Sequence, residues 1–153
     1  MAIAQLRSAV RLPQPGDVRF LERAEQICFS DPWPGHLLAA ELLAPSRFHR
    51  LLVGPAGQIM SYLFAAWQYL DLHVLKVATL PEFRRQGLAQ RLMALAEDHA
   101  AEMSGESLTL EVRRSNLAAT ALYGSMGYEL AGCRRGYYMD GEDALVMTKR
   151  LTA

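Results

Sequence analysis

The sequence predicts a mixed α/β protein with a single domain over residues 1–153 and a largely antiparallel sheet in its first half. Its 153 residues suit one domain with a real core and are too few for two. The composition, 51% hydrophobic and 21% charged, is typical of globular proteins. The apolar spacing predicts, in order, a strand, two helices, three strands, a helix, a strand, a helix and two strands.

The first half of the chain is predicted to place two helices between strands. A strand at 4–12 precedes Asp17, a candidate cap for a helix that runs to Phe29. After a proline-rich turn, a second short helix ends at Leu43. The remaining segments of this half are strands at 48–53, 59–67 and 70–80.

One stretch has two possible interpretations. Residues 51–70 carry no formal charge and have roughly the length of a membrane span. However, the turn sequence at 54–57 interrupts the stretch early, and Gln58, Ser61 and Gln68 dilute its apolar character. Two buried strands joined by a tight turn therefore account for it better, and no membrane contact is expected.

The second half of the chain begins with a long predicted helix at 86–103, where apolar residues recur at helical spacing and Gly105 follows the last turn. A strand at 107–112 comes next, followed by a helix at 116–125 that Gly127 ends. Two final strands are expected at 128–133 and 144–151.

Charge and cysteine content narrow the classes of partner. Sixteen basic residues balance sixteen acidic ones, so the net charge gives no argument for direct nucleic-acid binding. Cys28 and Cys133 are far apart and fit free thiols in a reducing cytosol, and no signal peptide is evident, so we expect a cytoplasmic protein. The four histidines lack metal-ligand spacing, and no metal is predicted.

The strongest local signal is a turn that opens the long helix, with the sequence Arg84-Arg85-Gln86-Gly87-Leu88-Ala89. The first turn of a helix leaves several backbone N–H groups without intrahelical acceptors, all pointing one way. Gly87 allows close approach of the backbone, and the arginines add positive charge. The turn suits a pyrophosphate, although an ordinary arginine-rich loop would have the same sequence.

Two motifs resemble the GCN5-related N-acetyltransferases, the GNAT family. The turn at 84–89 resembles that family's coenzyme A signature, and the run from Asn116 to Tyr128 is similar to the family's second half. The resemblance covers nearly the whole chain and implies the GNAT fold with acetyl-coenzyme A as co-substrate. The residues that it assigns to the coenzyme are Val77, Ala78, Thr79, Arg84, Arg85, Gln86, Gly87, Leu88, Ala89, Gln90 and Asn116.

Three further segments are similar to the RimI-type branch of the family. They are the first helix and loop at 29–33, the strand at 110–116, and the loop at 134–144. This similarity implies transfer of an acetyl group to a protein N-terminus, the N-terminal alanine of a small-subunit ribosomal protein. It also implies substrate contacts from Trp33, Tyr137 and Tyr138, for which packing at a strand edge is the alternative.

Glu111 is the candidate general base, because an attacking amine must lose a proton. It alternates with Leu110 and Val112, so its side chain faces the side of the strand opposite to theirs. The resemblance places this glutamate in the catalytic cleft. The alternative is a surface carboxylate paired with Arg113 or Arg91.

Tyr123 is the candidate general acid that returns a proton to the departing thiolate. It follows Asn116 by seven residues, which is two helical turns, so both address one face of the helix. A tyrosine hydroxyl is normally protonated at neutral pH and can donate to sulfur. A core tyrosine is the alternative, and Asn116 could simply cap its helix. For the oxyanion, the resemblance implies a backbone donor near Val77.

Two other functions compete with the N-terminal acetyltransferase. The same fold could act on a small amine such as a polyamine or an aminoglycoside, or the chain could bind coenzyme A without catalysis. The joint presence of Glu111 and Tyr123 counts against a pure binding module. A covalent intermediate on Cys133 is disfavoured because no histidine stands in a recognisable relation to it, so direct transfer is expected.

Overall fold

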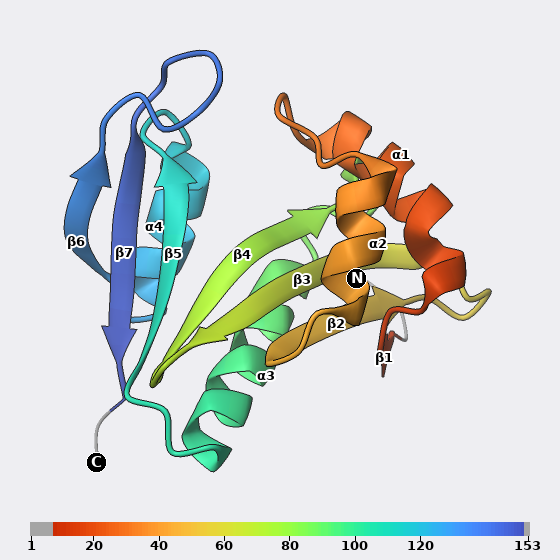
Figure 1. Ribbon diagram of the computed structural model, residues 1–153, viewed down its shortest axis with the longest axis horizontal. Helices are drawn as coiled ribbons and strands as arrows, with labels where there is room; N and C mark the ends of the chain where they lie inside the picture. The colour runs from red at the N-terminus through yellow and green to blue at the C-terminus, as the bar shows by residue number, and fades with distance from the viewer. Residues whose placement is uncertain (1–7, 152–153) are drawn as a thin grey trace, which may run out of the picture. The chain divides into compact units, whose positions relative to one another are not determined.

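The computed structural model describes residues 8–151 and confirms the predicted order of helices and strands (Figure 1). The strands form a seven-stranded sheet in the order β1-β2-β3-β4-β5-β7-β6. The strands are β1 (Ala9–Arg11), β2 (Arg47–Val53), β3 (Ile59–Gln68), β4 (Asp71–Thr79), β5 (Ser107–Arg113), β6 (Glu129–Arg134) and β7 (Ala144–Arg150). The α-helices are α1 (Val18–Cys28), α2 (Gly35–Leu43), α3 (Leu88–Glu102) and α4 (Leu117–Ser125), and short 3-10 turns lie at Pro15–Asp17 and Pro81–Phe83.

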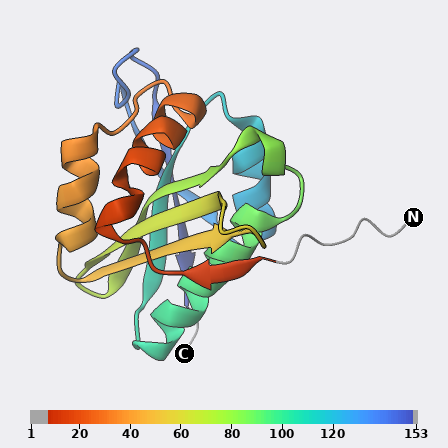
Figure 2. The same ribbon diagram turned by 90° about the vertical axis from the view of Figure 1, so that its right-hand side faces the viewer.

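The sheet is mixed. β1 runs antiparallel to β2, as Figure 2 shows at the edge of the sheet, and tight turns join β2 to β3 and β3 to β4. The predicted antiparallel first half is therefore confirmed. β4 and β5 are parallel, with α3 as the crossover between them, and β7 pairs antiparallel with both β5 and β6.

The chain divides into two compact parts. The first comprises the described residues up to Phe64 together with Lys76–Met93, and the second comprises Ala65–Leu75 and the described residues from Ala94 onward. The boundary falls within β3, β4 and α3. The expectation of a single domain stays a prediction.

The core of the first part is built around β3, whose residues 59–64 are all buried. Helices α1 and α2 lie side by side in this part and each contributes a fully buried leucine, Leu21 from α1 and Leu38 from α2 (Figure 1). The apolar stretch at 51–70 thus forms buried strands, as expected. No helix in the described part of the chain is long and apolar enough to cross a membrane.

A buried carboxylate connects three elements of the first part. Glu25 of α1 has no solvent exposure, and its carboxylate accepts hydrogen bonds from the Tyr62 hydroxyl of β3 at 2.6 Å and the Trp33 backbone N–H at 2.9 Å. It also forms an ion pair with Lys76 of β4, whose ammonium lies 3.9 Å from the centre of the Phe29 ring. Burial lowers the pKa of Lys76, and Glu25 opposes that shift.

The second part shows regular alternation along β5. Leu108, Leu110 and Val112 are buried, whereas the residues between them are only half-buried. Helix α4 covers one face of β5 and β7 (Figure 1). It begins after Asn116, whose side-chain oxygen accepts from the Ala119 N–H at 3.1 Å, and it ends before Gly127, which has a φ of 95°. The predicted roles of both residues at the helix ends are confirmed.

Several element ends differ from expectation. Of the predicted strand at 4–12, residues 4–7 lie outside the described residues, and β1 ends at Arg11. Helix α3 begins at Leu88 rather than residue 86, because Arg85 and Gly87 have φ values of 64° and 73°, which a right-handed helix cannot include.

Asp17 does not cap α1, contrary to prediction. It stands at the N-cap position, but its carboxylate accepts from the Gln14 backbone N–H at 2.7 Å and from both terminal nitrogens of Arg11 at 2.9 Å. These contacts hold the 3-10 turn in front of the helix. The carboxylate therefore fixes the direction in which β1 leads into α1.

Replacing Glu25 by Gln should destabilise the protein by about 3–5 kcal/mol, because the Lys76 ammonium is left buried without its counter-charge. The double variant Glu25→Gln/Lys76→Met removes both charges and should recover more than half of that loss. Urea unfolding followed by circular dichroism measures both free energies. Equal destabilisation of the single and double variants would contradict a role for the charge pair.

Candidate active site

The predicted phosphate turn lies in the first part, between β4 and α3. After the 3-10 turn at Pro81–Phe83, the chain passes through left-handed conformations at Arg85 and Gly87 before α3 begins. Among the described residues other than Gly87 and its two chain neighbours, no heavy atom lies within 4 Å of the position that a Cβ on Gly87 would occupy. Gly87 is therefore required by backbone conformation, and the space beside it is open to a ligand. Arg85 and Gln86 are exposed.

Arg84 has a structural contact as well as its charge. Its Nε donates to the carbonyl oxygen of Thr79 at 3.0 Å, which ties the turn back to the end of β4. At the same strand end, Ser61 Oγ donates to the Ala78 carbonyl at 2.7 Å and lies 3.0 Å from Thr79 Oγ1. The segment Val77–Thr79 is thus held by side chains of the first part, and Ala78 is buried while Val77 and Thr79 are only half-buried.

Trp33, the predicted substrate contact of the first part, lies beside the buried Glu25 cluster. Its ring stacks on Phe64 with a centroid separation of 5.9 Å, and the Lys76 ammonium lies 4.8 Å from the ring centre. The loop after α1 is therefore fixed by aromatic packing together with the hydrogen bond from the Trp33 backbone to Glu25.

In the second part, Glu111 is held from two sides. Its Oε2 lies 2.6 Å from His73 Nε2 on β4, and its Oε1 lies 3.4 Å from Arg134 Nε on β6. The side chain is 9% exposed, and it faces the side of β5 opposite to Leu110 and Val112, as predicted. Of the two arginines named as alternative partners, Arg113 binds Asp140 and Glu142, and Arg91 binds Ser8.

Tyr123 is buried in the second part, on α4. Its ring makes an edge contact with Tyr128 at a centroid distance of 6.0 Å. Burial, with a smaller contribution from Tyr138, raises the pKa of Tyr123 to about 12, so the hydroxyl stays protonated at neutral pH. Its hydroxyl makes no hydrogen bond to another residue of the described chain.

Tyr137 and Tyr138 lie in the loop between β6 and β7, where their rings meet edge to face at 5.1 Å. Tyr138 packs beneath the Arg113 guanidinium, 4.0 Å from the ring centre, and Tyr137 is half exposed. Burial raises the pKa of Tyr138 to about 12, and Glu111 is among the charges that contribute.

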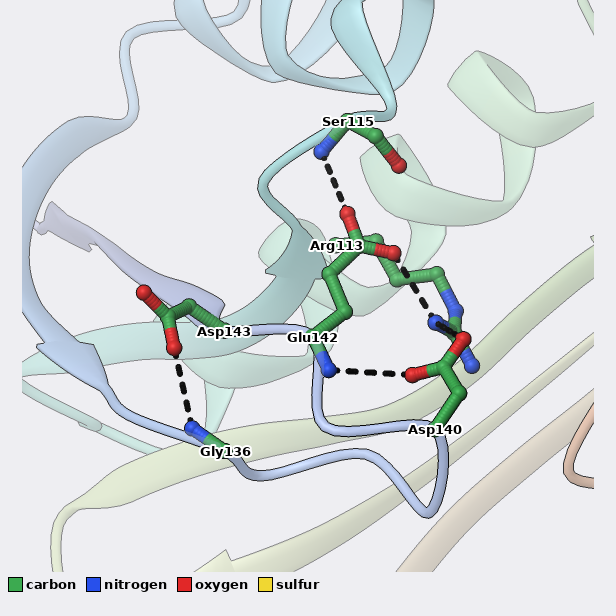
Figure 3. A network of polar contacts seen from close by, with 6 residues as sticks. All are labelled: Arg113, Ser115, Gly136, Asp140, Glu142 and Asp143. Atoms are coloured by element: carbon green, nitrogen blue, oxygen red, sulfur yellow. Dashed lines mark hydrogen bonds and ion pairs between the residues drawn. The ribbon is translucent and has the colours of Figure 1, made fainter.

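A network of carboxylates fixes the path of this loop (Figure 3). Glu142 accepts from Arg113 at 2.9 Å and from the Ser115 backbone N–H at 2.7 Å, while Asp140 accepts from Arg113 at 2.9 Å. At the other end of the loop, Asp143 accepts from the Gly136 N–H at 2.9 Å. The donors Ser115 and Arg113 lower the pKa of Glu142, so the contacts of Glu142 with these donors are intact at neutral pH and are lost as the pH falls through that lowered value.

The sequence analysis did not assign roles to His73 and Arg134, which contact Glu111, or to Gln68, which contacts His73. Gln68 Nε2 lies 2.9 Å from His73 Nδ1, and His73 in turn contacts Glu111. His73 alternates with the buried Leu72 and Val74, so its face could have been read from the strand pattern, but its distant partner could not. In the described residues, no group of three or more His, Cys, Asp or Glu side chains could hold a metal ion.

The chain belongs to the acetyltransferase (GNAT) family, whose model matches residues 18–128. It is an N-acetyltransferase, and the family uses acetyl-coenzyme A as the acetyl donor. A putative ribosomal protein bS18-alanine N-acetyltransferase of Bacillus subtilis (strain 168) is 34% identical over 143 residues, which make up 92% of this chain and 94% of that protein.

Two comparisons with Escherichia coli agree with this assignment. The ribosomal protein bS18-alanine N-acetyltransferase of strain K12 is 32% identical over 126 residues, covering 80% of this chain and 84% of that protein. The crystal structure of the ribosomal-protein-S18-alanine N-acetyltransferase from Escherichia coli superposes with a TM-score of 0.87 and 27% identity, covering 96% of each chain. The predicted GNAT fold and RimI-type resemblance are confirmed.

Gly87→Glu should abolish binding of acetyl-coenzyme A, because it adds bulk and negative charge in the open space beside the turn. Gly87→Ala is the matched control, since both variants force a side chain onto a residue with a φ of 73°, at a cost of about 1 kcal/mol. Isothermal titration calorimetry should show a small loss of affinity for acetyl-coenzyme A in the alanine variant and no detectable binding in the glutamate variant. Wild-type affinity in Gly87→Glu would refute the phosphate assignment.

Proposed function

We propose that the protein acetylates the α-amine of a protein N-terminus, the N-terminal alanine of a small-subunit ribosomal protein, by direct transfer from acetyl-coenzyme A. The observation that carries the choice of acceptor is the similarity to the Bacillus subtilis and Escherichia coli proteins over most of both chains. A ribosomal acceptor implies that the reaction occurs in the cytoplasm.

The first part supplies the coenzyme site in this proposal. The open space beside Gly87, the exposed Arg85 and the unsatisfied N–H groups of the first turn of α3 fit a pyrophosphate. The backbone of Val77–Thr79 pairs with the pantetheine arm like an added strand, and Gln86, Leu88, Ala89 and Gln90 complete the turn. Asn116, in the second part, adds a coenzyme contact besides its cap. Acetyl-coenzyme A supplies a thioester whose carbonyl carbon the amine attacks.

Glu111 is the proposed general base. An α-amine has a pKa near ~8, so a useful fraction is neutral at physiological pH, and only the proton released during attack must be removed. The nitrogen lone pair forms the new C–N bond while Glu111 takes that proton, directly or through water. The backbone N–H near Val77 is proposed to stabilise the oxyanion that forms before the C–S bond breaks.

Tyr123 is the proposed general acid. As the C–S bond breaks, the sulfur leaves with the electron pair and takes the hydroxyl proton of Tyr123. A pKa of about 12 keeps that proton in place at neutral pH, so every enzyme molecule begins the reaction with the donor loaded. The phenolate then regains a proton from water.

The acceptor contacts are proposed to come from Trp33, Tyr137 and Tyr138. An N-terminal peptide needs an extended binding surface, and aromatic side chains bind peptide backbone with little loss of conformational entropy. Tyr137 is half exposed and therefore accessible to a peptide, whereas the carboxylate network around it keeps the loop in one path.

An alanine-initiated peptide of ribosomal type should be acetylated at its N-terminus. The same peptide with a blocked N-terminus and a free internal lysine should not react, because a lysine amine has a pKa near ~10.4 and is almost entirely protonated. Mass spectrometry of both peptides, with a polyamine in the same panel, locates the acetyl group. Acetylation chiefly on lysine, or only on the polyamine, would contradict the proposed acceptor while leaving the family assignment intact.

Tyr123→Phe should reduce turnover on the order of the 10²–10⁴-fold typical of general acid–base groups, with little change in acetyl-coenzyme A binding. Tyr128→Phe is the matched control, since Tyr128 is also buried and its hydroxyl has no hydrogen-bond partner in the described structure. Pre-steady-state kinetics must first show that the chemical step limits turnover. If both variants then turn over equally fast, Tyr123 only packs.

A further inference from the structure

His73 has no assigned role in the proposed reaction, yet it makes the shortest contact to the proposed base. Its Nε2 lies 2.6 Å from Glu111 Oε2, and the two side chains are only 12% and 9% exposed. On the other side of the ring, Nδ1 lies 2.9 Å from Gln68 Nε2 at the end of β3. Gln68, His73 and Glu111 therefore form a continuous chain of hydrogen bonds within the second part.

The direction of these hydrogen bonds follows from the chemistry of the amide. Gln68 Nε2 carries only donor hydrogens, so His73 Nδ1 must accept. A neutral imidazole that accepts at Nδ1 carries its proton at Nε2, and Nε2 therefore donates to Glu111. Gln68 thus selects the tautomer in which His73 gives a hydrogen bond to the carboxylate and brings no positive charge to it.

The strand register explains why these residues meet. β4 and β5 are parallel, with His73 opposite Thr109, so Glu111 is the next residue along β5 that faces the same side. The other groups facing the carboxylate come from β6 and the following loop. Arg134, whose side chain is 56% exposed, lies 3.4 Å from Oε1, and Glu111 is among the charges that raise the pKa of Tyr138 in the loop.

We propose that His73, with its tautomer fixed by Gln68, is a positioning residue that holds Glu111 Oε2 through a neutral hydrogen bond and leaves Oε1 to accept the proton of the substrate amine. This inference rests on the proposed role of Glu111. A neutral donor orients the carboxylate, whereas a full positive charge at the same place would weaken it as a base. The second oxygen is faced by an exposed arginine, which a substrate can displace.

The first test compares two substitutions of His73 in the full-length protein. His73→Leu removes the donor and should lower kcat roughly tenfold or more, with the KM for acetyl-coenzyme A within about twofold of wild type. His73→Gln places an amide N–H near the position of Nε2 and should restore much of the lost kcat. A residue that only packs would not be rescued by an amide. Equal kcat in both variants and wild type would overturn the proposal.

The second test changes the tautomer of His73 by substituting Gln68, without altering His73 or Glu111. Gln68 is exposed, so its substitution should leave the fold intact even if His73→Leu does not fold. Gln68→Glu offers Nδ1 an acceptor instead of a donor, which forces a proton onto Nδ1 and either charges the ring or turns a lone pair toward Glu111. It should lower kcat more than the near-isosteric Gln68→Met, which leaves the tautomer unforced. Equal kcat for the two Gln68 variants would overturn the tautomer argument.

A Glu111→Gln variant separates this inference from the proposed function. If Glu111→Gln loses turnover but the His73 and Gln68 variants retain it, the base stands and the positioning role is wrong. If Glu111→Gln retains full turnover, the proposed base itself is wrong. Thermal unfolding of each variant, with unchanged midpoints, establishes that the kinetic differences arise in the folded protein.

Discussion

The candidate general base of the second part, Glu111, depends on one constraint, the alternation of side chains along a β-strand. Leu72 and Val74 of β4 and the leucines of β5 enter the core, so the residues between them must face the other way. Among those residues are His73 and Glu111, which the parallel register brings to hydrogen-bonding distance. Packing of the core thereby fixes the position of the carboxylate, because a shift of one residue in either strand would turn the polar side chain of that strand into the core.

The first part of the chain contains a buried charge, the carboxylate of Glu25. Glu25 is fully buried and has donors on three separate segments, so its desolvation is offset by hydrogen bonds and by Lys76. The cluster orders the turn that carries Trp33 at the same time. Each part thus contains a carboxylate that is held by several contacts. Glu25 is buried within hydrophobic packing, and Glu111 lies on the polar face of β5.

Local signals in the sequence predicted the order of elements and the face of Glu111, because periodicity, glycines and prolines act over a few residues. The start of α3 was missed because glycine also fits inside a helix, so the sequence does not show that Gly87 takes a left-handed conformation. The role of Asp17 was missed because its carboxylate serves the preceding turn. The contacts of Glu111 with His73 and Arg134 were not predicted, because these residues reach it only through strand pairing, and the register of distant strands cannot be read from a single sequence.

In the β6–β7 loop, the carboxylate network holds the backbone, which is the frame of the loop, and other residues form the exposed surface. Arg113 and Glu142 define the path of the backbone, while Tyr137 and Met139 project outward and are exposed. Mutations at the projecting positions can therefore accumulate without altering the frame. Under the proposed function, substitutions at these positions would change which N-terminal sequences are accepted by small steps, each of them compatible with a folded and active ancestor, as long as the arginine and its carboxylates persist.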